Sequence, residues 1–129
     1  MLTVDNLSKS FGKKTVLDNI SVQLTHGVYG LLGPNGSGKT TFSKVLCGLM
    51  APRTGEIRLN GKKMTHRELL KKTYFVMQDA DYQLFTESVT HEMELAARKN
   101  KQKNVHASKE ETTNILDRFG LAEYSERHP

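Results

Sequence analysis

Apolar and polar residues alternate in two stretches of the first half of the chain, residues 16–24 and residues 53–62. A period of two is typical of a strand with one face toward solvent. In the second stretch the alternation ends at Asn60-Gly61, a pair that favours a tight turn. We therefore expect a strand in the first stretch and an edge hairpin in the second.

Two short runs are apolar without alternation: residues 28–32 (VYGLL) and residues 73–77 (TYFVM). Runs of this length usually indicate strands that are buried on both faces of a sheet. We expect each run to form such a strand, the first ending at Gly33 and the second at Gln78.

Helical spacing first appears after residue 38. Apolar residues recur there with the spacing i, i+3, i+4 and i+7, which is the pattern of an amphipathic helix. They are Phe42, Val45, Leu46 and Leu49. Gly48 weakens this helix slightly, and Pro52 is expected to end it.

Three further helices are expected at residues 67–72, 89–99 and 108–119. In the second of these, acidic residues come early and basic residues late, which suits the helix dipole. The third begins with a capping-box pattern, Ser108 followed by Glu111, and is followed by Gly120, a suitable C′ residue. We therefore divide the chain into a strand-rich domain, residues 1–78, and a helical one, residues 79–129.

Composition narrows the possible classes of protein. A length of 129 residues allows one modest domain or part of a larger one, and the net charge of +5 suits phosphate ligands, an acidic partner or simply a lysine-rich surface. The single cysteine, Cys47, is compatible with a reducing compartment such as the cytosol. No run approaches the roughly 18 apolar residues of a membrane span, so we expect any membrane role to come through a partner.

Residues 33–40 carry the most specific chemistry. Their sequence, GPNGSGKT, fits the pattern Gly-x4-Gly-Lys-Thr of a phosphate-binding loop, in which glycines let successive N–H groups point toward one anion. Lys39 would place a positive charge at the β- and γ-phosphates, and the Thr40 hydroxyl would ligate Mg²⁺. An apolar run precedes the loop and an amphipathic helix follows it, so we predict a nucleoside triphosphate site formed by Gly33, Pro34, Asn35, Gly36, Ser37, Gly38, Lys39 and Thr40.

The residues around this loop narrow the family. The segments LSKSFGKKTVLDNISVQL before it, GLLGPNGSGKTTFSKVLCGLMAPRTGEIRLNGK around it and YFVMQDADYQLF after it occur in one chain. Together they resemble the ATP-binding subunit of ABC transporters over essentially the whole length. The resemblance implies an α/β fold, that of a P-loop NTPase of the ABC ATPase type, with ATP and Mg²⁺ as ligands.

The resemblance also implies roles for residues outside the loop. Phe11 matches the position of an aromatic residue that stacks on adenine, and Thr41 would add a hydroxyl near the α-phosphate. Gln78 matches the Q-loop glutamine, which in the family reaches the Mg²⁺ and the attacking water. We therefore count Gln78 as a catalytic and metal-site candidate, and Thr40 as the other metal ligand.

One stretch, QDADYQLFTESVTHEMELA, is similar to the ATPases of energy-coupling-factor importers; an export ATPase remains an alternative. In that family the surface corresponding to residues 79–94 faces a transmembrane partner. A second ATPase subunit completes a head-to-tail dimer on the cytoplasmic face of the membrane. The resemblance implies these partners and this location, and we expect no nucleic-acid partner.

The chain departs from the family's pattern in one respect. Its 129 residues contain no Leu-Ser-Gly-Gly-Gln signature, Walker B strand, catalytic glutamate, D-loop or switch histidine. We therefore expect an incomplete domain, truncated before the signature, that does not turn over ATP by itself. The runs at residues 28–32 and 73–77 would then lack neighbouring strands and expose apolar faces. Alternatives are a truncated, non-catalytic module that binds a full-length ATPase, and a P-loop kinase of small molecules.

Overall fold

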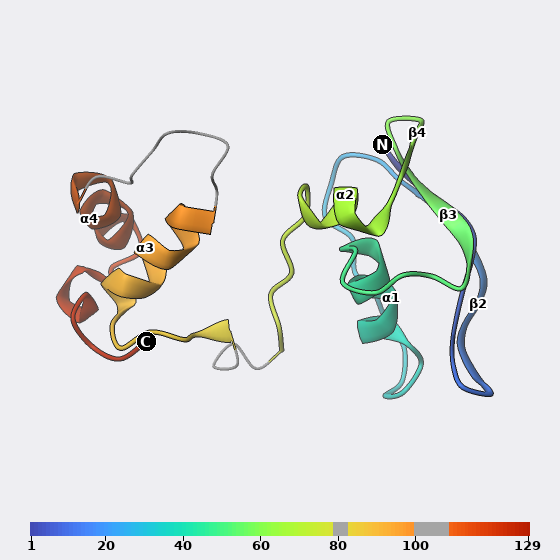
Figure 1. Ribbon diagram of the computed structural model, residues 1–129, viewed down its shortest axis with the longest axis horizontal. Helices are drawn as coiled ribbons and strands as arrows, with labels where there is room; N and C mark the ends of the chain where they lie inside the picture. Colours follow the sequence, from blue (N-terminus) through green and yellow to red (C-terminus); the bar gives the residue numbers. More distant parts are fainter. Residues whose placement is uncertain (79–82, 100–108) are drawn as a thin grey trace. The chain divides into compact units, whose positions relative to one another are not determined.

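The computed structural model describes residues 1–78, 83–99 and 109–129. The chain falls into two compact units, Met1–Phe75 and Val76–Pro129 (Figure 1). The first unit contains β1 (Leu2–Phe11), β2 (Lys14–Leu24), α1 (Lys39–Leu46), β3 (Thr54–Leu59), β4 (Lys62–Met64) and α2 (His66–Leu70). The second contains α3 (Val89–Lys99), α4 (Lys109–Arg118) and the short 3-10 helix η2 (Ala122–Tyr124). The domain boundary expected after residue 78 stays a prediction.

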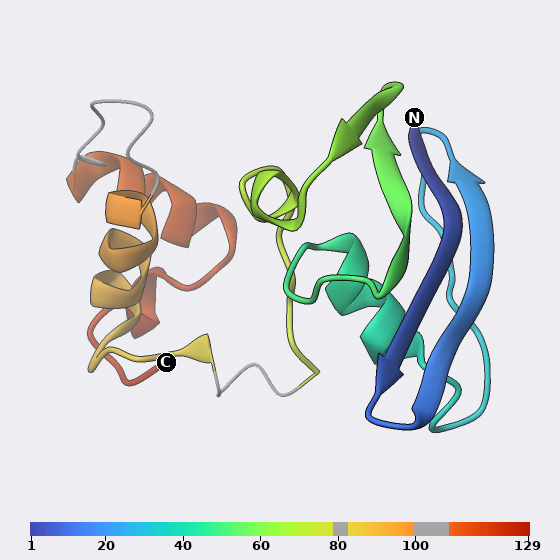
Figure 2. The same ribbon diagram turned by 45° about the vertical axis from the view of Figure 1, so that its right-hand side comes forward.

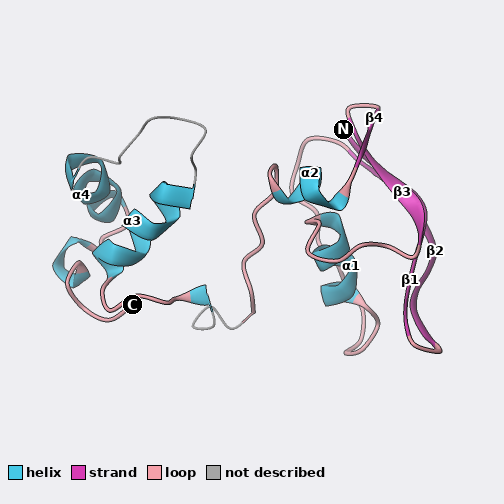
Figure 3. Cartoon of the chain, in the orientation of Figure 1, coloured by secondary structure: helices cyan, strands magenta, loops and turns pink. Residues whose placement is uncertain are grey.

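The strands form one antiparallel sheet in the order β2-β1-β3-β4 (Figure 3). The expected strand at residues 16–24 lies within β2, which pairs with β1 from Leu2↔Leu24 to Phe11↔Lys14. The expected edge hairpin is formed by β3 and β4 around Asn60-Gly61, where Leu59 pairs with Lys62. Both predictions from the alternating pattern are therefore confirmed.

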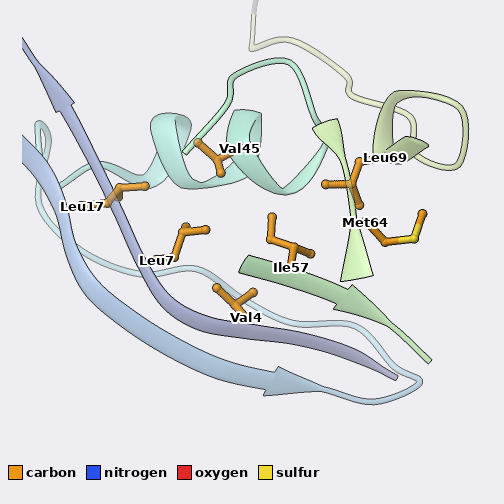
Figure 4. Packing of buried hydrophobic residues seen from close by; sticks show 7 residues of the cluster. All are labelled: Val4, Leu7, Leu17, Val45, Ile57, Met64 and Leu69. Carbon is orange, nitrogen blue, oxygen red and sulfur yellow. The ribbon is translucent and has the colours of Figure 1, made fainter. Parts of the chain in front are cut away.

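The hydrophobic core of the first unit lies between the sheet and the helices α1 and α2. Figure 4 shows side chains from all six elements pointing toward one another. Burying these side chains is the main favourable contribution to folding of this unit, and the buried cluster consists of Val4, Leu7, Leu17, Val45, Ile57, Met64 and Leu69.

The helix α1 is shorter than its apolar spacing predicts. It ends at Leu46, and Gly48 adopts a left-handed conformation with φ +74°. The amide of Gly48 donates to Val45 O at 3.0 Å and that of Leu49 donates to Lys44 O at 2.9 Å, the paired bonds of a Schellman motif. The predictions that Pro52 ends the helix and that Leu49 belongs to its apolar face are therefore wrong, because Gly48 turns the chain first.

The two apolar runs at residues 28–32 and 73–77 are not strands in the structure. Both have irregular backbone, and no strand of the described sheet pairs with them. Val28 and Leu32 are 102% and 92% exposed, and Tyr74 is 88% exposed. The expectation of buried strands is therefore wrong, whereas the expectation that these runs expose apolar side chains is confirmed.

The expected short helix at residues 67–72 is formed as α2, with Thr65 as its N-cap. The Thr65 hydroxyl accepts from the amide of Glu68, and the Glu68 carboxylate accepts from the amide of Thr65 at 2.9 Å, so the two residues form a capping box. This backbone hydrogen bond, followed by the side-chain bonds from Lys62 and Thr65, lowers the pKa of Glu68 to about 2.

The predicted helix at residues 89–99 is α3. Ser88 precedes it and is buried, and its Oγ accepts from the amide of His91 at 3.3 Å. This N-cap was not predicted, although a serine directly before an apolar helical pattern is the usual signal. The amides of Val89 and Thr90 donate to Arg127 O and Ser125 O, both at 3.0 Å, which ties the last residues of the chain to the start of α3.

The last predicted helix is α4. Gly120 has φ +67°, its amide donates to Asp117 O at 3.0 Å, and the amide of Leu121 donates to Leu116 O at 2.8 Å. This is again a Schellman motif, so the prediction of Gly120 as the C′ residue is confirmed. Ser108, the predicted N-cap, lies outside the described residues.

Candidate phosphate-binding site

Residues 33–40 form a loop that leads directly into α1. The amide of Ser37 donates to Pro34 O at 3.2 Å, which closes a turn, and Gly38 is the N-cap of α1 with φ +95°. A Cβ atom at Gly38 would lie 3.0 Å from Val16 O and 3.1 Å from the side chain of Leu17. Glycine is required here for both its conformation and its size, and the end of the loop therefore rests on β2.

The N-terminus of α1 offers unpaired donors to the loop. The amide of Phe42 donates to Gly38 O at 2.8 Å, and Gly38 provides no side-chain cap. The first amides of a helix have no partner within the helix, and the helix dipole places a partial positive charge there. No acidic residue lies in the first turn. This terminus is therefore suited to an anion.

Lys39 adds a full positive charge to the same place. Its Nζ donates to Gly33 O at 2.7 Å and to Pro34 O at 2.8 Å, so the side chain folds back along the loop. None of the ion pairs among the described residues includes Lys39. Two carbonyl groups hold the ammonium in position without neutralising it, and its charge is available to an anionic ligand.

The remaining loop residues complete the candidate site. Asn35, Gly36 and Ser37 are exposed, and a Cβ atom at Gly33 would meet Ser37 Oγ at 2.8 Å, so the loop closes tightly on itself. Thr40 is exposed and follows Lys39 in the first turn of α1, where its hydroxyl is an oxygen ligand of the kind Mg²⁺ accepts. Unpaired amides, an ammonium group and a hydroxyl are together the donor set that a magnesium-bound triphosphate needs.

The turn that joins β1 to β2 lies at the same end of the first unit as the loop of residues 33–40 (Figure 2). Phe11 directly precedes this turn. It is the last residue of β1 and pairs with Lys14, and Val16, two residues further along β2, contacts the Gly38 position. Phe11 is 48% exposed, and Lys9 Nζ lies 5.5 Å from the centroid of its ring. The structure thus brings Phe11 and residues 33–41 to one end of the first unit.

Gln78 belongs to the second unit, where it is exposed in a bend. Its predicted place beside the Mg²⁺ and the attacking water stays a prediction. The following residues, 79–82, which begin the surface predicted to face a membrane partner, lie outside the described residues.

Sequence reasoning missed two contributors to this end of the unit. Lys9 could have been found from its spacing, because residues i and i+2 of a strand share a face and place Lys9 beside Phe11. Val16 gave no such signal, because the approach of its carbonyl and side chain to the Gly38 position depends on how β2 packs against the loop.

The fold and the loop define a P-loop nucleotide-binding protein. A family model described as ABC transporter matches residues 17–129, which is most of the chain. The chain therefore belongs to the ABC transporter family, and its fold is that of an ABC ATPase.

Similar proteins agree with this assignment. The chain is 34% identical to the putative HMP/thiamine import ATP-binding protein YkoD of Bacillus subtilis, over 100% of the chain and 23% of that protein. It is similar to the structure of cbiO1 from Clostridium perfringens, part of the ABC transporter complex cbiONQ, with a TM-score of 0.77 and 26% identity over 98% of the chain and 53% of cbiO1.

A second solved structure supports the fold alone. The dimeric, post-hydrolysis ATP-binding cassette MJ0796 bound to ADP and Pi has a TM-score of 0.77 at 23% identity, over 100% of the chain and 62% of the cassette. The chain spans between 23% and 31% of the length of the first curated relatives that it matches. None of the helices in the described ranges is long and apolar enough to cross a membrane.

Proposed function

We propose that the chain binds ATP with Mg²⁺ at residues 33–41, as the ATP-binding part of an ABC transporter ATPase. That ATPase would couple ATP binding and hydrolysis to transport through a membrane partner. The observation that carries the proposal is the position of Lys39, which holds an unneutralised cation beside the uncapped N-terminus of α1. Membership of the ABC transporter family supports ATP as the ligand.

Different residues of the first unit are proposed to bind different parts of the ligand. The amides of the loop and of α1, with Lys39, bind the phosphates, while the Thr40 hydroxyl ligates Mg²⁺ and that of Thr41 approaches the α-phosphate. The exposed ring of Phe11 stacks on the base, a contact that needs a π-face and no hydroxyl. Mg²⁺ supplies charge neutralisation on the phosphates.

Hydrolysis of ATP requires more than a phosphate-binding site. Hydrolysis needs a positioned water and charge stabilisation as well as a phosphate site. We assign Gln78 to the Mg²⁺ and the attacking water, and none of the 129 residues matches the family's pattern of an apolar strand followed by a polarising carboxylate. The chain by itself is therefore proposed to bind ATP without hydrolysing it, and steady release of inorganic phosphate by the purified chain would contradict this part of the proposal.

The proposed partners are those of an ABC transporter ATPase. A second ATPase subunit is proposed to form a head-to-tail dimer with the first, and a transmembrane subunit is proposed to contact residues 79–94. The ATPase would then lie on the cytoplasmic face of the membrane. Similarity to a putative HMP/thiamine import protein, YkoD, and to cbiO1 of the cbiONQ complex supports an importer of the energy-coupling-factor type.

The variant Lys39→Ala tests the phosphate site. Hydrogen bonds to charged groups contribute roughly 1.5–3 kcal/mol, so the affinity for Mg-ATP in a calorimetric titration should fall by about 10- to 100-fold. Lys44→Ala is the matched control, because it removes the same charge from the same helix outside the loop. Unchanged ATP affinity in Lys39→Ala, with the control behaving like the parent chain, would show that the loop does not hold the phosphates.

A further inference from the structure

Lys9 links the candidate base-binding residue to the segment that follows α1. Its Nζ lies over the Phe11 ring, 5.5 Å from the centroid, and donates to Ala51 O at 2.7 Å. Lys9 and Phe11 are two residues apart on β1 and therefore share a face of the sheet. The ammonium thus has two partners that are far apart in the sequence.

The segment that holds the Lys9 ammonium is itself fastened to β1. The amide of Arg53 donates to Ser8 O at 2.8 Å, and Arg53 Nη1 donates to Ser10 Oγ at 3.4 Å. These bonds lie on either side of Lys9 along the strand. They place Ala51 O at a defined position, and the Lys9 ammonium is therefore held in one place beside the ring.

We propose that Lys9 is a positioning residue for the nucleotide base. Its ammonium covers one face of the Phe11 ring through a cation–π contact and leaves the other face for the base. A cation on one face of a ring draws electron density from it, and a ring already held in place loses little freedom when a base stacks on it. The inference rests on the proposed stacking of the base on Phe11, and it adds that Lys9 acts through the ring and not through the phosphates.

The test compares a triphosphate that carries a nucleoside with one that does not. Mg-ATP carries a base, whereas Mg-tripolyphosphate presents the phosphates without one. Lys9→Met keeps much of the apolar stem and removes the charge. A cation–π contact at a partly exposed site corresponds to roughly a two- to fivefold change in affinity. We therefore expect the preference for ATP over tripolyphosphate, measured by titration, to fall by about that factor.

Two further variants test whether the effect of Lys9 depends on its position over the ring or only on its charge. Lys13→Met removes an equal charge from the neighbouring hairpin turn and should leave the preference for ATP unchanged. Lys9→Arg keeps a cation over the ring and should also preserve it, and this variant tests the proposal even if Lys9→Met fails to fold in a circular-dichroism melt. An equal loss of affinity for both ligands in Lys9→Met, no loss for either, or a lost preference in Lys9→Arg would each overturn the proposal.

Phe11→Ala distinguishes this inference from the proposed function. If the base stacks on Phe11, this variant loses most of the preference for ATP, and adding Lys9→Met to it causes no further loss. If Phe11→Ala keeps the full preference, the stacking assignment itself is wrong. If Phe11→Ala loses the preference while Lys9→Met keeps it, the stacking stands and the role of Lys9 is refuted.

Discussion

The two units of the chain bury apolar side chains to different extents. In Met1–Phe75 seven buried hydrophobic residues form one cluster between the sheet and two helices. In Val76–Pro129 Leu116 is the one hydrophobic side chain that is buried among the described residues, and Ser88 and Thr112 are buried polar residues. A sheet covered by helices encloses a core from two sides, whereas two short helices can bury only a stripe.

Hydrogen bonds at the helix ends help to hold the second unit together. The Ser88 cap, the turn at Gly120 and the bonds from Val89 and Thr90 to the end of the chain hold its helices. In the first unit the candidate phosphate-binding loop rests on the core directly, because Gly38 packs on Leu17, a member of the buried cluster. We therefore expect the order of the loop to depend on the core of the first unit.

Truncating a core side chain in each unit is the strongest test of this difference. Leu7 is fully buried, and Leu7→Ala should lower the free energy of unfolding by about 2–5 kcal/mol. Leu116→Ala should lower the free energy of unfolding by about 2 kcal/mol, at the low end of this range, because fewer apolar neighbours surround Leu116. Hydrogen-exchange mass spectrometry should show the loss of protection in residues 1–75 for the first variant and in residues 83–129 for the second.

Leu32→Ala is the control for this pair. Leu32 is 92% exposed, so the same truncation should change stability by no more than about 0.5 kcal/mol. If Leu7→Ala and Leu116→Ala reduced protection equally across both units, the two units would unfold as one, and the comparison would fail.

A substitution at Gly48 tests how closely α1 and α2 approach each other. A Cβ atom there would lie 2.2 Å from His66 O, and the backbone is left-handed. Gly48→Ala should therefore destabilise the first unit by about 2–3 kcal/mol in urea unfolding. Gly12 has φ +57°, and a Cβ atom there would have no atom within 4 Å. Gly12→Ala therefore measures the left-handed backbone conformation alone, which should lower the free energy of unfolding by about 1 kcal/mol. Equal effects of the two variants would show that α2 can move away from α1 at little cost.

The smallest expected effect is the pH dependence that Glu68 gives to the first unit. Its pKa is about 2 in the folded chain against 4.5 for the free group, so its contribution is present above pH 4.5 and is lost as the pH falls toward about 2. Urea midpoints measured across this window should fall less in Glu68→Gln than in the parent chain.

The variant Thr65→Ala tests which hydrogen bonds cause the pH dependence. It removes the hydroxyl bonds of the capping box and keeps the amide of Thr65, the largest cause of the lowered pKa of Glu68. The pH dependence should therefore be reduced only in part. A parent chain and a Glu68→Gln variant with parallel pH profiles would show that the carboxylate does not stabilise α2.

Elements that depend on neighbouring residues were predicted well. The alternation in β2, the Asn60-Gly61 turn and the C′ glycine of α4 each depend on a few adjacent residues, and the structure contains all three. The runs at residues 28–32 and 73–77 were predicted wrongly as strands, because a strand forms only where a neighbour accepts and donates its backbone hydrogen bonds. Apolar composition alone does not supply that neighbour.

In the candidate site, too, some features were predicted from adjacent residues and others depend on the tertiary structure. The prediction that residues 33–40 form a phosphate-binding loop follows from their order in the chain, since glycines, a lysine and a threonine at this spacing carry the chemistry locally. The contact of Val16 O with the Gly38 position and the place of the Lys9 ammonium between Phe11 and Ala51 do not follow from it. Each joins residues from separate elements, whose distance depends on the packing of the sheet against α1.

Residue order was therefore enough to predict the strand at residues 16–24, the hairpin at Asn60-Gly61, the C′ glycine of α4 and the chemical character of the loop, because these depend on backbone preferences over a few residues. Tertiary packing decided how closely α2 approaches the end of α1 and which surface supports the loop. It also decided which side chain covers one face of the Phe11 ring. These outcomes depend on which groups compete for the same space and the same hydrogen bonds, and only the folded arrangement brings such groups together.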